Sequence, residues 1–256
     1  MISVTAYSFL IFLACGMDMS LMIVIDFTGS NGHPLHPQSL QYLSTQCPQY
    51  QQVIRTIDNI VPCYDSDKNF PVWIYGKVSH DFALNVELYG STLFQPILSK
   101  AIASAAHSNV KNKIQYFTLL VLTDDVINNF KEIKDLLYWA NKYLSLSIII
   151  VGIGLADFTQ IEALDADSGA LKNSQGEAAK RGIVRFVSLR DYSKPLRDAN
   201  GHVIGFTYTR SAELSKENLK DIPQQFMSYI KAYNLSLLKL TTAVNILPTI
   251  YIYIFV

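Results

Sequence analysis

Short runs of consecutive apolar residues, each closed by polar residues, dominate the middle of the chain. The runs at 21–25, 116–122 and 146–151 predict strands buried on both faces, because a parallel strand covered by helices needs no polar side. Shorter strands are predicted at 70–75 and 184–187. Apolar residues recur at helical spacing over 48–61, 131–143 and 219–233, which predicts amphipathic helices. Alternating strands and helices predict an α/β fold, a doubly wound, mostly parallel sheet with helices on both faces.

The two ends of the chain are apolar, and they set the expected domain limits. We expect an apolar lead-in over 1–19, one domain over 20–235 and an apolar tail over 236–256. No Lys or Arg precedes the apolar run of the first 17 residues, so a buried lead-in is favoured over a secretory signal. A helix in the tail would span roughly 25 Å and is interrupted by Pro248, so packing on the domain is favoured over a membrane span.

Charge and cysteine usage narrow the class of protein. The chain has 21 Lys+Arg and 21 Asp+Glu among 256 residues, and this balance argues against binding to nucleic-acid phosphates. Half of the residues are hydrophobic, which is enough for a sizeable core. Cys15, Cys47 and Cys63 have no C-x-x-C spacing, so neither a disulfide framework nor a zinc site is indicated. A reducing, cytoplasmic setting is therefore expected.

Carboxylates follow two of the predicted buried strands. Asp26 closes the first run, and Asp124 comes directly after the run at 116–122 and one threonine. The carboxyl ends of parallel strands meet at one edge of the sheet, so these two side chains should lie close together. Mg²⁺ prefers oxygen ligands and often takes only one or two carboxylates, so a divalent-cation site is predicted here.

Hydroxyl groups accompany both carboxylates. Asp26, Thr28 and Ser30 form the pattern D-x-T-x-S directly after the first strand. Side chains two residues apart in a tight loop can converge on one ion, although the same spacing also suits a helix cap or an Asx turn. Thr92 adds a hydroxyl in a loop before a predicted helix, ahead of Asp124 in the chain.

Three competing motifs fail on spacing. Gly152 and Gly154 follow a strand, but Asp157 occupies the position where a dinucleotide-binding fingerprint has its third glycine. The acidic run at 165–169 lacks the glycine and the glutamate of a calcium-binding loop. Thr28 stands where a nucleophile elbow around Ser30 would need glycine.

The order of Asp26, Thr28, Ser30, Thr92 and Asp124 resembles the metal-ion-dependent adhesion site of von Willebrand factor A domains. The amino-acid sequence most resembles the A domain of copines, over about residues 7–235. The segments that carry this resemblance are 25–32 (IDFTGSNG), 64–68 (YDSDK), 78–85 (VSHDFALN), 147–154 (SIIIVGIG), 156–158 (ADF) and 222–226 (IPQQF).

The resemblance implies a divalent-metal-dependent protein-interaction module and no enzyme. In such domains the five residues hold Mg²⁺ or Mn²⁺, with Ca²⁺ as an alternative, and leave one position open for an acidic group of a partner protein. Copines are linked to calcium-dependent phospholipid binding, and this implies a cytoplasmic protein that also reaches the inner face of the plasma membrane.

The sequence also departs from the copine pattern. The two C2 domains that carry phospholipid binding in copines have no counterpart within these residues, so calcium-dependent recruitment to the membrane is not expected of these residues alone. Copines insert a helix-containing stretch where Asn85 is followed directly by Val86, so the resemblance implies that one crossover helix is missing after Asn85. Asp125 also replaces a glycine after the third-loop aspartate. Two alternatives remain open: an incomplete variant without a working metal site, and a metal-assisted hydrolase on the same fold.

Overall fold

A computed structural model of the chain describes residues 4–14, 17–33, 36, 39–42, 49–58, 71–75, 94–108, 115–124, 127, 129–165, 169–201, 203–208 and 211–234. Its helices are α1 (Val4–Ala14), α2 (Gln49–Asp58), α3 (Phe94–Ser108), α4 (Phe130–Tyr143), α5 (Thr159–Glu162), α6 (Ser211–Leu219) and α7 (Ile222–Ala232). Its strands are β1 (Asp18–Asp26), β2 (Val72–Tyr75), β3 (Gln115–Thr123), β4 (Leu146–Gly152), β5 (Val184–Ser188), β6 (Ser193–Arg197) and β7 (Val203–Tyr208). Two 3₁₀ turns, η1 (Gly29–Asn31) and η4 (Leu189–Tyr192), follow β1 and β5.

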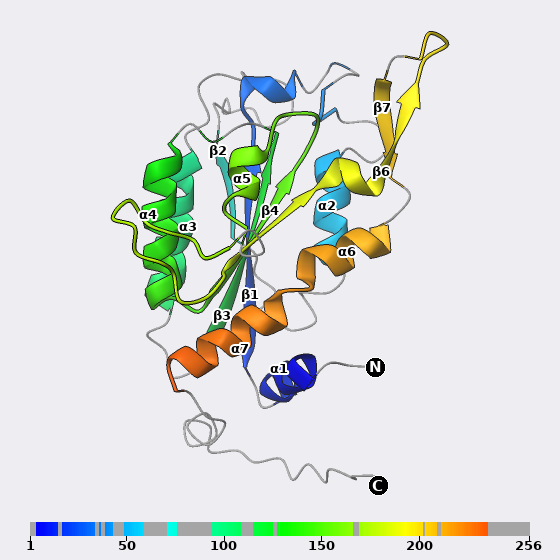
Figure 1. Ribbon diagram of the computed structural model, residues 1–256. Coiled ribbons are helices and arrows are strands. Elements are labelled where there is room, and N and C mark those ends of the chain that lie inside the picture. Colours follow the sequence, from blue (N-terminus) through cyan, green and yellow to red (C-terminus); the bar gives the residue numbers. More distant parts are fainter. Residues whose placement is uncertain are drawn as a thin grey trace, which may run out of the picture.

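The central sheet has five strands in the order β2-β1-β3-β4-β5, and all four pairings are parallel. In its middle, Ile23 pairs with Leu120, and Leu120 pairs with Ile149. These strands coincide with the five apolar runs of the sequence, so the predicted doubly wound parallel sheet is confirmed. Because every strand runs in the same direction, the carboxyl ends of all five strands lie at the same end of the sheet (Figure 1).

Both faces of the sheet are covered by helices (Figure 1). Successive strand residues point to opposite faces, so Val24 packs with α3 and α4, whereas Ile23 packs with α1, α2, α6 and α7. Eight of the nine residues of β3 are buried, which explains why this strand has no polar face. The two apolar layers hold the sheet as a rigid support for the loops at its carboxyl edge.

The start of the chain, where an apolar lead-in is expected, contains a helix that packs on the domain. Residues 4–14 form helix α1, and the rings of Phe9 and Phe12 lie 5.4 and 5.2 Å from the ring of Phe226 on α7. Apolar side chains occur on all sides of α1, so its sequence shows no helical period. The first strand begins at Asp18, three residues before the apolar run that predicted it.

Helix α3 connects β2 to β3 and lies on the same face as α4 (Figure 1). Its buried side chains Phe94, Leu98 and Ile102 cover that face of the sheet. Asn85, where copines insert further residues, lies outside the described residues, as does the apolar tail over 236–256. Among the helices that the structure describes, none has both the length and the apolar character required to cross a bilayer.

Candidate metal centre

The two predicted carboxylates lie at the carboxyl ends of neighbouring strands. Asp26 is the last residue of β1, and Asp124 directly follows β3. The two strands are paired in parallel up to Ile25 and Leu122. Both carboxylates are buried, so each of them needs polar partners from the surrounding residues.

The loop after β1 folds back on Asp26. Thr28 donates two hydrogen bonds to Oδ1 of Asp26, one from its backbone N–H over 2.8 Å and one from Oγ1 over 2.6 Å. The 3₁₀ turn η1 follows at once and is capped by Gly32, whose φ of +73° suits a residue without a side chain. This tight turn directs Thr28 and Ser30 toward the same point in space.

Ser30 joins the first loop to Asp124. Its Oγ lies 2.9 Å from Oγ1 of Thr28 and 3.1 Å from Oδ1 of Asp124. Asp26, Thr28, Ser30 and Asp124 thus form a row of oxygens with three close contacts, for which the two hydroxyls have only one proton each to donate. A row of oxygens that is short of protons fits a hard cation, which is bound by oxygen lone pairs.

A second copy of the same local motif tests the Asx-turn alternative. Asp157 and Thr159 repeat the D-F-T sequence, and Thr159 donates to Oδ1 of Asp157 from N–H over 3.0 Å and from Oγ1 over 2.6 Å. That copy is exposed, whereas the copy at Asp26 is buried and continues to Ser30. The Asx turn therefore accounts for the local bonds at both places, but not for the long-range oxygen row.

Two residues that sequence reasoning did not select also hold the carboxylates. Thr123 donates from Oγ1 to Oδ2 of Asp26 over 2.8 Å, and Asn31 donates from Nδ2 to Oδ1 of Asp124 over 2.8 Å. Tyr50 on α2 donates its hydroxyl to Oδ1 of Asn31 over 2.6 Å and so fixes the orientation of the amide. The one sequence signal that could have identified Asn31 is its position directly after the D-x-T-x-S pattern.

The structure thus brings together four of the five predicted ligands, namely Asp26, Thr28, Ser30 and Asp124. Thr92 and Asp125 lie outside the described residues. Within the described part of the chain, no group of three or more His, Cys, Asp or Glu side chains could hold a metal ion. The candidate site depends instead on hydroxyl oxygens added to two carboxylates.

Comparisons with known proteins agree with this architecture. The family model described as Copine matches residues 79–237 of the chain. Protein BONZAI 1 of Arabidopsis thaliana is 36% identical over 264 residues, an alignment that covers 90% of this chain and 43% of that protein. Protein BONZAI 2 of the same plant is 34% identical, with 90% of this chain and 42% of that protein covered. The chain therefore spans about two fifths of the length of these curated relatives.

The parallel five-stranded sheet with helices on both faces is consistent with the α/β architecture of von Willebrand factor A-like domains. The chain belongs to the copine family, because the family model matches more than half of its residues.

Proposed function

We propose that this chain is a copine A domain that binds a protein partner through a divalent metal ion at the carboxyl edge of its sheet, and that it is not an enzyme. The proposal is supported by one observation above others, the row of oxygens from Asp26 through Thr28 and Ser30 to Asp124. This row connects two buried strand ends that are 98 positions apart in the chain.

The number of candidate ligands favours a site that also takes a partner. The protein offers at most five side chains as ligands of the ion, namely Asp26, Thr28, Ser30, Asp124 and the remaining candidate, Thr92. Mg²⁺ takes about six oxygen ligands, so at least one position is left for water or for a carboxylate of another protein. When bound, the ion supplies an electrophilic point for such an acidic group, and the protein side chains hold its place.

Mg²⁺ or Mn²⁺ is the proposed ion, and Ca²⁺ is the alternative, because all candidate ligands are oxygen atoms. We propose a cytoplasmic location, with recruitment to the inner face of the plasma membrane dependent on other parts of a longer copine. Calcium-dependent phospholipid binding is proposed for such a longer copine and not for these residues alone; membership of the copine family is its only support.

The test is a metal titration of the full chain, followed by calorimetry and by thermal unfolding in MgCl₂, MnCl₂ or EDTA. Binding of an ion to the native state alone must raise its stability, so the unfolding temperature should increase with either metal. Asp26→Ala should abolish the heat of binding and the temperature shift. Ser30→Ala removes one hydroxyl at an exposed position and should weaken binding while the fold is kept.

The matched control is Asp157→Ala, which removes the carboxylate of the exposed D-F-T copy. This variant should bind metal as the unaltered chain does. Absence of any metal effect on the unaltered chain, or an equal loss in Asp26→Ala and Asp157→Ala, would contradict the proposal.

A further inference from the structure

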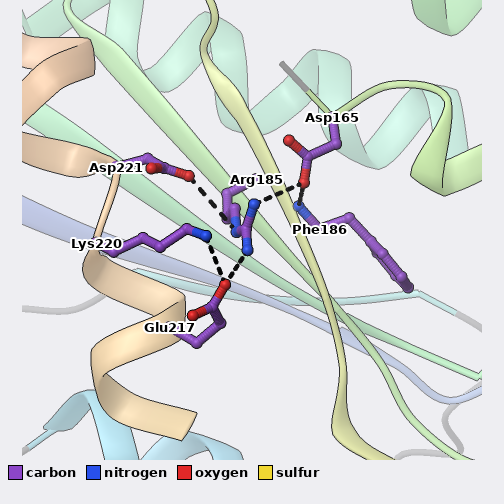
Figure 2. Close-up of polar contacts among 6 residues, drawn as sticks. All are labelled: Asp165, Arg185, Phe186, Glu217, Lys220 and Asp221. Carbon is purple, nitrogen blue, oxygen red and sulfur yellow. Dashed lines mark hydrogen bonds and ion pairs between the residues drawn. The ribbon is translucent and has the colours of Figure 1, made fainter. Parts of the chain in front are cut away.

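A second polar cluster surrounds Arg185 on β5 (Figure 2), and it shares no residue with the candidate metal centre. The guanidinium of Arg185 lies 3.4 Å from Oδ2 of Asp165 and 3.5 Å from Oδ2 of Asp221. It also forms an ion pair with Glu217 of α6, and Glu217 in turn pairs with Lys220 over 2.7 Å. Burial opposes the charge of Glu217, but the hydrogen bond from Lys220 and the charge of Arg185 lower its pKa below the usual value.

A cavity of about 300 Å³ adjoins this cluster. Four consecutive residues of β5 line it, from Arg185 to Ser188. Because side chains alternate between the faces of a sheet, four consecutive residues reach one cavity only along the edge of the strand. β5 is the last strand in the order of the sheet, so this cavity follows an edge that no described strand covers.

The backbone hydrogen bonds of β5 also indicate that one edge of this strand is uncovered. Ile148 of β4 donates its N–H to the carbonyl of Ile183, directly before β5. The backbone N–H and C=O groups of the odd-numbered residues of β5 therefore point toward β4, and those of the even-numbered residues point away from it. The N–H of Phe186 instead donates to Oδ2 of Asp165 over 2.8 Å. A carboxylate thus already replaces a neighbouring strand at one point of this edge, and Ser188 is the next residue of the same parity.

Ser188 supplies an independent sign of a missing ligand. Its side chain is only 6% exposed, and its Oγ has no hydrogen-bond partner. Ser188 is also one of the residues that line the cavity. Leaving a buried hydroxyl without a partner costs about 1–3 kcal/mol, so a ligand with a polar group at this place gains a contact that the chain alone does not provide.

The charge of the cavity defines the ligand. Four carboxylates and one guanidinium line it, from Glu162, Asp165, Asp191, Glu217 and Arg185. The described acidic residues form no group that could hold a metal ion, which favours an organic cation. An extended peptide fits best, because the cavity follows backbone at a sheet edge and such edges accept an added strand.

We propose that the edge of β5 binds an extended basic segment of a partner protein, whose backbone lies along Phe186 to Ser188 and whose Lys or Arg side chain enters the acidic cavity. This site is separate from the candidate metal centre and needs no metal ion.

The probe is a fluorescent pentapeptide with blocked ends, Val-Arg-Val-Arg-Val, measured against the full chain by fluorescence anisotropy. It should bind in EDTA, and it should bind at least tenfold more tightly than Val-Glu-Val-Glu-Val. N-methylation of its central residues should abolish binding, because a strand edge recognises backbone N–H groups. Free arginine amide at the same concentration should not compete.

The variant Glu162→Gln with Asp191→Asn changes two exposed residues that line the cavity and should weaken binding at least tenfold. The matched control, Glu132→Gln with Glu213→Gln, removes the same charge from exposed positions that do not line the cavity and should bind as the unaltered chain. Ser188→Ala should weaken binding about threefold, the value of one modest hydrogen bond.

Four results would each overturn the proposal. They are no binding of the basic peptide, equal binding of the acidic peptide, an equal loss in the two double variants, and full competition by arginine amide, which would show a small-cation site instead of a strand edge.

Discussion

Asn31 donates a hydrogen bond from Nδ2 to Oδ1 of Asp124 over 2.8 Å, across 93 positions of the chain. The same amide nitrogen lies 3.4 Å from Oδ1 of Asp26, so one neutral side chain stands between the two carboxylates of the candidate metal centre. Tyr50 holds the other end of the amide. Asn31 therefore offsets part of the repulsion between Asp26 and Asp124 when no ion is bound.

Replacement of Asn31 should affect the metal-free protein most. Asn31→Ala removes the donor to Asp124 and should lower the free energy of unfolding in EDTA by about 1–3 kcal/mol. Asn31→Asp adds a third carboxylate, so it should be less stable still in EDTA but gain more from Mg²⁺. Urea unfolding with and without metal measures both effects, and Tyr50→Phe is the control, with a loss of only about 1 kcal/mol. Equal metal dependence in Asn31→Asp and the unaltered chain would contradict this role.

Gly152 is required by the close approach of Phe158. A Cβ built on Gly152, the last residue of β4, would lie 2.7–2.9 Å from three atoms of the buried Phe158 ring. Gly152→Ala should therefore lower the free energy of unfolding by about 1–3 kcal/mol. Phe158→Leu in the same chain should recover part of that loss, and urea unfolding of the single and double variants measures the coupling. If Gly152→Ala proves as stable as the unaltered chain, the packing argument fails.

The parallel sheet could be predicted because its strands are buried on both faces and therefore appear as unbroken apolar runs, as in β3 and β4. Helix α1 could not, since it is apolar on all sides and its position depends on Phe226, more than 200 residues away. The hairpin of β6 and β7 was also missed. It lies outside the central sheet, so it shows no continuous apolar run.

The candidate site was predictable only as far as its residues follow strand ends. Asp26 and Asp124 were found because parallel strands place their carboxyl ends together. Asn31 and Thr123 were not selected, because their partners are fixed by the register of β1 and β3 and not by spacing along the chain. The glycines at 152 and 154, considered for a nucleotide fingerprint, have a structural basis in the contact with Phe158 and in a φ of +84° at Gly154.

Arg181 is a buried cation that no described carboxylate neutralises. Its guanidinium donates from Nε to the carbonyl of Asn141 over 2.9 Å and also to the carbonyl of Leu144, at the end of α4. The ring of Tyr229 lies 5.1 Å from the guanidinium carbon. These contacts satisfy the final carbonyls of a helix and place a positive charge at the negative end of its dipole.

Arg181→Ala should lower the free energy of unfolding by about 2–3 kcal/mol, because it leaves helix carbonyls without donors. Arg181→Lys keeps the charge but lacks the planar fork, so its loss should be intermediate. Urea unfolding provides the measurement. The control is Lys180→Ala at the neighbouring exposed position, where a change within about 0.5 kcal/mol is expected. Similar losses at both positions would show that Arg181 does not anchor α4.

Tyr116 should make the fold sensitive to alkali. Its hydroxyl is fully buried, lies 2.7 Å from Oγ of Ser147, and has its pKa raised by burial from 10.0 to about 12. Between these two pH values the unfolded chain loses the phenolic proton while the folded chain keeps it. The stability contribution is therefore complete below pH 10 and is lost as the pH rises toward 12.

At pH 11 this difference corresponds to about 1 kcal/mol of lost stability. Urea unfolding at pH 9 and pH 11 should show that loss in the unaltered chain and a smaller one in Tyr116→Phe, which has no phenolic proton to lose. Tyr143→Phe changes a tyrosine that is 50% exposed and should keep the full alkaline loss. An identical decrease for Tyr116→Phe and the unaltered chain would mean that burial of this hydroxyl does not govern the alkaline limit of the fold.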